Sequence, residues 1–175
     1  MNTAVLFLPL ALFTMHIGCA KKGKTEAAMP KWFLSQPELC GVGVAKMRGN
    51  MGAAKTTAEN SARADLSQQL ETSVESMITS YENEVGTAEG NFSEEETAIV
   101  SKSLSKQTLI GSIPQKHYIS KPDAQFYSLV CLNPGVLTDA INQMTQLSDA
   151  QRNSLARRAQ KLHEDLEKEL ETYDE

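Results

Sequence analysis

Apolar and small side chains recur at helical spacing from about residue 53 to residue 85. At about 100° per residue, the larger apolar side chains fall within an arc of roughly 120°: Leu66, Leu70, Val74, Met77, Ile78, Tyr81 and Val85. The first half presents Ala54, Ala58 and Ala62 instead. This pattern predicts one helix about 50 Å long. Its alanine half can lie close to a sheet, and its leucine half needs other cover.

Three stretches have the pattern of strands. Gly41 to Ala45 alternates glycine with valine, and glycine in a strand indicates close approach of another backbone. The alanine face of the long helix suits that approach. Leu109 to Ser120 is interrupted by Pro114, so it is an edge strand or contains a bulge. Gln125 to Leu132 is apolar on both sides, which predicts a central strand.

Shorter helices are predicted by capping residues and periodicity. Ser93 and Glu96 form a capping box for a helix that runs to about Lys106. A second short helix is expected at about Val136 to Gln146, after the break at residues 133–135. Two prolines, Pro30 and Pro37, flank Trp32 and Phe33. They predict an extended arm, with Trp32 either anchored in the core or exposed for a partner.

The last helix carries a narrow apolar stripe. Ser148 and Gln151 cap its start as a second capping box. Its apolar positions lie within roughly 80° of one another, which resembles a coiled-coil seam: Leu155, Ala159, Leu162, Leu166, Leu170 and Tyr173. Two uses of the stripe remain open, packing on the end of the long helix or contact with another subunit. Leu155, Leu162, Leu166 and Leu170 are the predicted partner-contact residues.

The order of these elements predicts an α+β fold with a long helix packed on a three-stranded, mostly antiparallel sheet, followed by C-terminal helices. A right-handed crossover joins the first two strands in parallel, and the third strand then fits between them. Cys40 and Cys131 face each other in that arrangement. We predict a disulfide between them, which in the chain-entropy model contributes about 4–5 kcal/mol. Two buried free thiols are the alternative.

The amino-terminal segment has the pattern of an export signal. Residues 4–17 are nearly all apolar and Cys19 follows. The run is short for a membrane span and suits a signal peptide. Residues 17–20 resemble a bacterial lipobox, which implies cleavage after Gly18 and a diacylglyceryl group on Cys19. A retained anchor, and an ordinary buried cysteine, are the alternatives. Residues 19–29 are polar and predict a flexible tether.

Charge and residue content narrow the classes of function. The 175-residue chain has a net charge of −5, so it lacks the surplus of basic residues that nucleic acid binding requires. Acidic residues dominate from Glu164 onward. Besides His16 in the signal, the histidines are His117 and His163, and no nucleophile or metal-ligand spacing accompanies them. We therefore expect no catalytic residues, no metal and no cofactor beyond the lipid on Cys19.

Several of these residues resemble those of the Lpp-twenty family of bacterial lipoproteins. The similar features are the P-x-W-F motif at residues 30–33, G-V-G-V-A at residues 41–45, the alanine-rich run to Val74 and the late strand at residues 127–130. The resemblance implies a dodecin-like strand–helix–strand–strand domain and an outer-membrane location. Relatives include lipoproteins associated with flagellar basal structures and surface antigens. The resemblance implies no catalytic residue.

The sequence thus predicts four segments: a signal peptide (1–18), a tether (19–29), an α+β domain (30–146) and an acidic amphipathic helix (147–175). The expected function is that of a non-enzymatic, lipid-anchored cell-envelope protein that contacts other envelope proteins or itself. The face of the outer membrane, periplasmic or surface, stays open. The alternative function is a periplasmic binding module for a small ligand or an envelope polymer.

Overall fold

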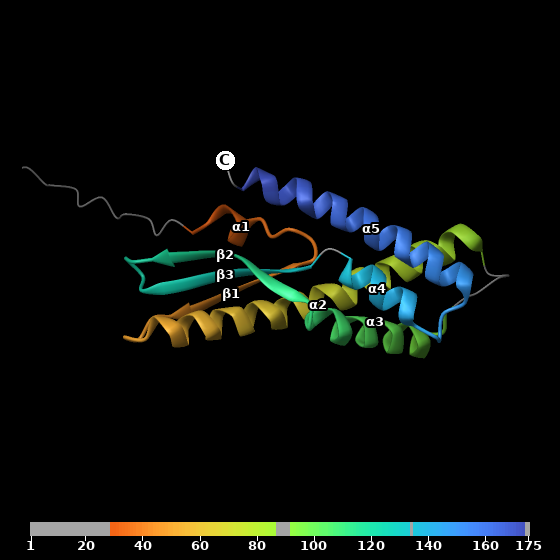
Figure 1. Ribbon diagram of the computed structural model, residues 1–175, viewed down its shortest axis with the longest axis horizontal. Helices are drawn as coiled ribbons and strands as arrows, with labels where there is room; N and C mark the ends of the chain where they lie inside the picture. Colours follow the sequence, from red (N-terminus) through yellow and green to blue (C-terminus); the bar gives the residue numbers. More distant parts are fainter. Residues whose placement is uncertain (1–28, 87–91, 134, 174–175) are drawn as a thin grey trace, which may run out of the picture.

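The computed structural model describes residues 29–86, 92–133 and 135–173. In chain order the elements are α1 (Lys31–Leu34), β1 (Cys40–Lys46), α2 (Met51–Val85), α3 (Glu94–Leu109), β2 (Ser112–Ser120), β3 (Gln125–Leu132), α4 (Val136–Gln143) and α5 (Asp149–Thr172). Helix α2 packs on a three-stranded antiparallel sheet, and α1 and α5 lie on the opposite side of that sheet (Figure 1). The predicted α+β architecture is confirmed.

The strand order is β1-β3-β2, with β3 antiparallel to both neighbours. The central position of β3 is therefore as predicted, and all of its residues except the half-buried Gln125 are buried. A register shift between Pro114 and Lys116 confirms the bulge in the edge strand β2. Strand β2 begins three residues later than expected, at Ser112, because α3 continues to Leu109. The side chain of Thr108 in the last turn of α3 is still fully buried.

The first half of α2 lies against β1 with almost no side chain between the two backbones. A Cβ atom on Gly41 would lie 1.9 Å from the carbonyl oxygen of Ala62, and a Cβ atom on Gly43 would lie 2.0 Å from that of Ala58. Both distances are shorter than any van der Waals contact, so only glycine fits at these positions. Ala58 and Ala62 are completely buried. The predicted match between the glycines of the strand and the alanines of the helix is confirmed.

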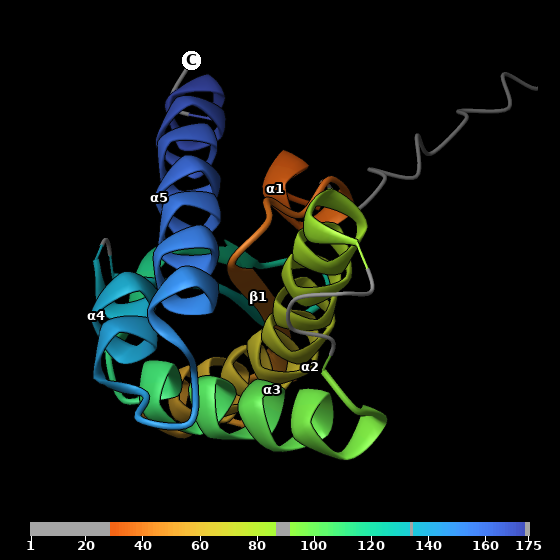
Figure 2. The ribbon, with the colours of Figure 1, turned by 90° about the vertical axis from the view of Figure 1, so that its right-hand side faces the viewer.

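The second half of α2 extends beyond the sheet and is covered by other helices of the same chain. Leu70, Val74 and Ile78 are buried there. Helix α3 crosses α2 closely, since the hydroxyl oxygens of Ser67 and Ser105 are only 3.0 Å apart. Helix α5 packs on α4 and on α2. Viewed from the helical end, α2 and α5 stand on opposite sides of the molecule, with α3 and α4 beneath them (Figure 2).

The prediction of an extended arm at Trp32 and Phe33 is wrong. These residues form the one-turn helix α1, in which the Phe33 N–H donates to the Pro30 carbonyl. Pro30 is compatible with this helix because it occupies the N-cap position, where a missing N–H costs nothing. Trp32 is 6% exposed and belongs to the main core, so it is a core anchor. The Phe33 ring packs edge-on against Tyr127 with centroids 4.9 Å apart.

The later helices begin where the sequence predicts. Both capping boxes are present, Ser93 with Glu96 and Ser148 with Gln151. Helix α4 ends at Gln143 rather than at the predicted residue 146. It is shorter because Met144 takes an extended conformation (φ −73°, ψ 114°) and places its side chain in the core with 3% exposure.

We expect Gly43→Ala to lower the free energy of unfolding by about 3 kcal/mol or more, because the new methyl group can fit only if α2 moves away from β1. Gly52→Ala is the matched control. A Cβ atom there meets only the Asn50 Oδ1 atom at 3.4 Å, and alanine in a helix is favoured over glycine by up to about 1 kcal/mol. Urea unfolding followed by circular dichroism measures both variants. Equal stabilities of Gly43→Ala and the wild type would contradict the close approach.

Candidate functional site

The predicted disulfide between strands β1 and β3 is present. Cys40 and Cys131 lie directly opposite each other in β1 and β3, with Cα atoms 3.9 Å apart, and they are bonded through their sulfurs. The side chains of both residues are fully buried. Disulfides persist in oxidising compartments, so this bond indicates an extracytoplasmic location. No helix in the described ranges is long and apolar enough to cross a bilayer.

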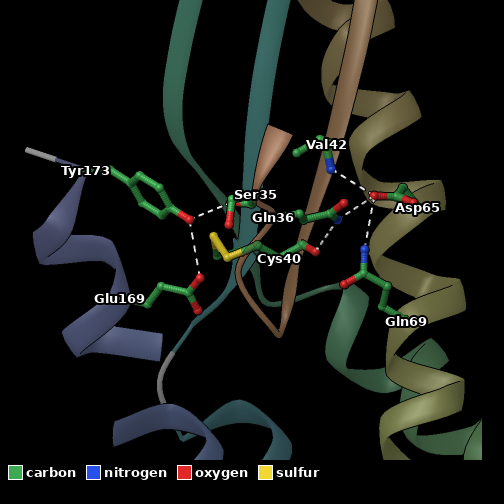
Figure 3. Close-up of a disulfide and its surroundings, with 9 residues drawn as sticks. Ser35, Gln36, Cys40, Val42, Asp65, Gln69, Glu169 and Tyr173 are labelled. Carbon is green, nitrogen blue, oxygen red and sulfur yellow. Dashed lines mark hydrogen bonds between the residues drawn. A yellow bond between two sulfur atoms is a disulfide. The ribbon is translucent and has the colours of Figure 1, made fainter. Parts of the chain in front are cut away.

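A polar cluster lies at the start of β1, beside the disulfide (Figure 3). The Asp65 Oδ2 atom on α2 accepts hydrogen bonds from the Val42 N–H at 2.9 Å and from the Gln36 side chain at 2.6 Å. The same Gln36 amide donates to the Cys40 carbonyl, and Gln69 donates to Asp65. Edge strands with free N–H and C=O groups pair readily with other chains. The cluster therefore satisfies this part of the edge from within the chain.

The end of α5 is tied to the connection between α1 and β1. The Tyr173 hydroxyl donates to the Ser35 carbonyl and lies 3.2 Å from the Glu169 carboxylate (Figure 3). Burial raises the pKa of the Tyr173 hydroxyl above its ordinary value. This contact links residues 138 positions apart, so α5 is part of the same folded body as the sheet.

The leucine stripe of α5 is used inside the chain. Leu155 and Leu166 are buried, at 0% and 3% exposure, and Leu162 and Leu170 are half-buried against the main core. Of the two alternatives, packing within the chain is therefore the one observed. Contact of these leucines with a second subunit stays a prediction.

An open recess lies between the second half of α2 and α5. Its volume is about 530 Å³. It is lined by Glu38 and by polar and apolar side chains of α2 and α5. The α2 residues are Thr72, Ser73, Ser76, Met77 and Ser80, and the α5 residues are Arg158, Lys161, Leu162 and Asp165. Arg158 is held at one end by an ion pair with Glu84 (2.6 Å). The recess can therefore offer a polar ligand neutral hydroxyl groups, cationic donors and anionic acceptors.

His163 is the buried titratable group of α5. It is 6% exposed, and neither ring nitrogen has a hydrogen-bond partner within the described residues. Burial lowers the pKa of its imidazole below the ordinary value, and the Glu167 carboxylate opposes this only in part. Asp139 and Glu164 line the same small recess between α4 and α5. Burial of His163 therefore favours the neutral form of its imidazole.

The acidic triplet Glu94 to Glu96 serves the start of α3. Glu96 accepts a hydrogen bond from the Ser93 backbone N–H at 2.8 Å. That bond, and a second one from the Ser93 hydroxyl, lower the pKa of Glu96. Acidic residues in a first turn also offset the helix dipole. Within the part of the chain that the structure describes, no group of three or more histidine, cysteine, aspartate or glutamate side chains could hold a metal ion.

The predicted sites divide into three groups. Gly18 and Cys19 lie outside the described residues. Cys40 and Cys131 are brought together, and the third group, the α5 leucines, packs within the chain. The two histidines for which no catalytic or metal role was predicted, His117 and His163, are on separate elements, β2 and α5. The sequence interpretation missed the cluster around Asp65 and Gln36. Asp65 directly precedes the buried Leu66, so a charge at the border of the buried face was the available signal.

Family models and curated proteins give no relative of this chain. No protein-family model matches this chain, and no curated protein matches it either. The resemblance to the Lpp-twenty family therefore stays a prediction.

We expect the free energy of unfolding to fall as the pH drops below about 6.5, the value for histidine in an unfolded chain. The folded state binds the His163 proton less readily than the unfolded state, so the loss continues down to the folded-state pKa and then levels off. His163→Leu removes this part of the pH dependence. Urea unfolding at pH values on both sides of 6.5 gives the two curves. Parallel curves for the wild type and the variant would contradict the assignment.

Proposed function

We propose that this chain is a lipid-anchored lipoprotein of the bacterial cell envelope that acts through protein–protein contacts and not as an enzyme. The single observation that carries the proposal is Cys19, which directly follows an apolar segment ending in Ile17 and Gly18. The Cys40–Cys131 disulfide supports it, since export delivers the domain to an oxidising compartment. The resemblance to the Lpp-twenty lipoproteins favours the outer membrane.

The partners in this proposal are other envelope proteins or further copies of the chain. Surface side chains support contacts of this kind: Leu34, Ile99 and Ile110 are large apolar residues with 72%, 51% and 87% exposure. Exposed apolar side chains of this size lose contact with water when a protein partner covers them. The chain supplies an anchor and a rigid disulfide-closed domain that presents such side chains.

The alternative function, binding of a small ligand or an envelope polymer, is favoured by the recess between α2 and α5. Its serine and threonine hydroxyls and the ammonium group of Lys161 suit a polar ligand. The recess is partly open to solvent, so a ligand larger than the recess can extend beyond it.

We expect cells that express the wild-type chain to incorporate an alkyne-labelled palmitate into it, and the Cys19→Ser variant to incorporate none. The reason is that the Cys19 thiol is the predicted acceptor of the diacylglyceryl group. Fluorescence of the conjugated label after gel electrophoresis measures both. Membranes from the same cells, crosslinked and pulled down, then identify proteins that the wild type captures and the variant does not.

Equal labelling of the two chains would place the lipid elsewhere, and absence of label from the wild type would contradict the anchor. Capture of no envelope protein, combined with a monomer in sedimentation, would contradict the proposed protein contacts.

A further inference from the structure

The end of the molecule where the sheet begins is formed by three neighbouring segments. They are the end of β1 with the loop to residue 50, the first turns of α2, and the turn between β2 and β3. The Met47 N–H donates to the Ala124 carbonyl at 2.7 Å, and Lys46 pairs with Gln125 across the sheet. These contacts join β1 and its loop to the β2–β3 turn, and the Asn50 side chain of the loop accepts a hydrogen bond from the Ala53 N–H of α2. The three segments lie at the left end of Figure 1. We call this surface the basic end.

Exposed cationic side chains dominate the basic end: Lys46, Arg48, Lys55 and Lys121. Two carboxylates near these cations, Asp123 and Glu59, already have partners within the chain. Asp123 accepts a hydrogen bond from the Ser120 hydroxyl. Glu59 has a side-chain exposure of only 16% and lies within ion-pair distance of Lys55, Arg63 and His117. The basic end is therefore a positive surface on a chain whose net charge is −5.

The shape and apolar content of the basic end suit a lipid head group. An open recess of about 440 Å³ lies between the end of β1 and the first turns of α2, and both Lys46 and Arg48 line it. Met51 at the start of α2 is 57% exposed next to these cations. A basic surface with an exposed apolar side chain is typical of contact with an anionic membrane, where cations meet head groups and the apolar group reaches the acyl boundary.

The opposite end of the molecule carries the other sign of charge. The last turn of α2 contains Glu82 and Glu84, of which Glu84 forms an ion pair with Arg158 of α5. The first turn of α3 adds three glutamates, at residues 94–96. An anionic surface repels this end and attracts the basic end, so electrostatics favours one orientation. The described chain begins beside α1, in the same half of the molecule as the sheet (Figure 1). An anchor that precedes α1 and a membrane contact at the basic end can therefore be made on the same half of the molecule.

We propose that the basic end binds the anionic head groups of the membrane in which the chain is anchored. This contact holds the sheet end against the membrane and directs the acidic helical end, with the starts of α3 and α5, toward partners. The inference rests on the proposed lipid anchor, and it adds the orientation of the domain and the chemistry of its second membrane contact.

The test uses the full lipidated chain in vesicles of phosphatidylcholine with phosphatidylglycerol. The cysteines 40 and 131 are in the disulfide and the Cys19 sulfur carries the lipid in the lipidated chain, so Met51→Cys supplies a single thiol for an environment-sensitive fluorophore. Asn83→Cys, an exposed position near the other end of α2, is the matched control. A quencher attached to lipid head groups should reduce the fluorescence at residue 51 several-fold more than at residue 83. Salt at about 1 M, where the screening length is about 3 Å, should remove the difference.

Charge variants separate the basic end from general electrostatics. Lys46→Glu with Arg48→Glu should abolish the selective quenching at residue 51. Lys102→Glu with Lys106→Glu, the same change of charge on exposed positions of α3, should leave it unchanged. If the first pair prevents folding, as judged by circular dichroism, Lys121→Glu in the exposed turn replaces it and should weaken the quenching.

The outcomes distinguish the two proposals. A labelled chain that fails to float with the vesicles contradicts the lipid anchor, and it also shows that the basic end binds no membrane. A chain that floats with equal quenching at residues 51 and 83 overturns the orientation alone. Selective quenching that is the same in vesicles of phosphatidylcholine alone also overturns it, because the contact would then need no anionic lipid.

Discussion

The close approach of α2 to β1 is the constraint on which the rest of the structure depends. Two glycines, Gly41 and Gly43, bring the strand within contact of the helix backbone at Ala62 and Ala58. The approach fixes where α2 crosses the sheet, and it leaves the leucine half of α2 beyond the sheet edge. That half then provides the surface on which α3 and α5 pack. The Asp65 carboxylate can reach the Val42 N–H only because the helix lies this close.

The same arrangement gives the molecule two different ends. The sheet end combines basic side chains with the exposed Met51, and the helical end collects the acidic end of α2 and the acidic start of α3. The Cys40–Cys131 bond and the contact of Tyr173 with Ser35 hold the parts between them as one body. A rigid body with unlike ends suits a protein that is fixed to a membrane on one side and meets partners on the other.

Local signals in the sequence predicted most of the fold. Capping boxes, glycine positions and apolar periodicity depend on neighbouring residues, so the starts of α3 and α5 and the bounds of β3 were correct, and α2 begins two residues before the predicted position. Features that depend on distant contacts were missed. The one-turn helix at Trp32 forms against the core, and the Asp65 cluster forms only when α2 meets β1. His163 is spaced four residues after Ala159 and three before Leu166, so its burial was visible in the pattern, but its lack of a partner was not.

The most direct test of the account is a nuclear Overhauser measurement on the protein labelled with ¹³C and ¹⁵N. If α2 lies on β1 without intervening side chains, the Hα protons of Gly41 and Gly43 give strong cross-peaks to the backbone protons of Ala62 and Ala58. Absence of these cross-peaks, with the β1–β3 cross-strand peaks present, would contradict the close approach and with it the placement of every helix that packs on α2.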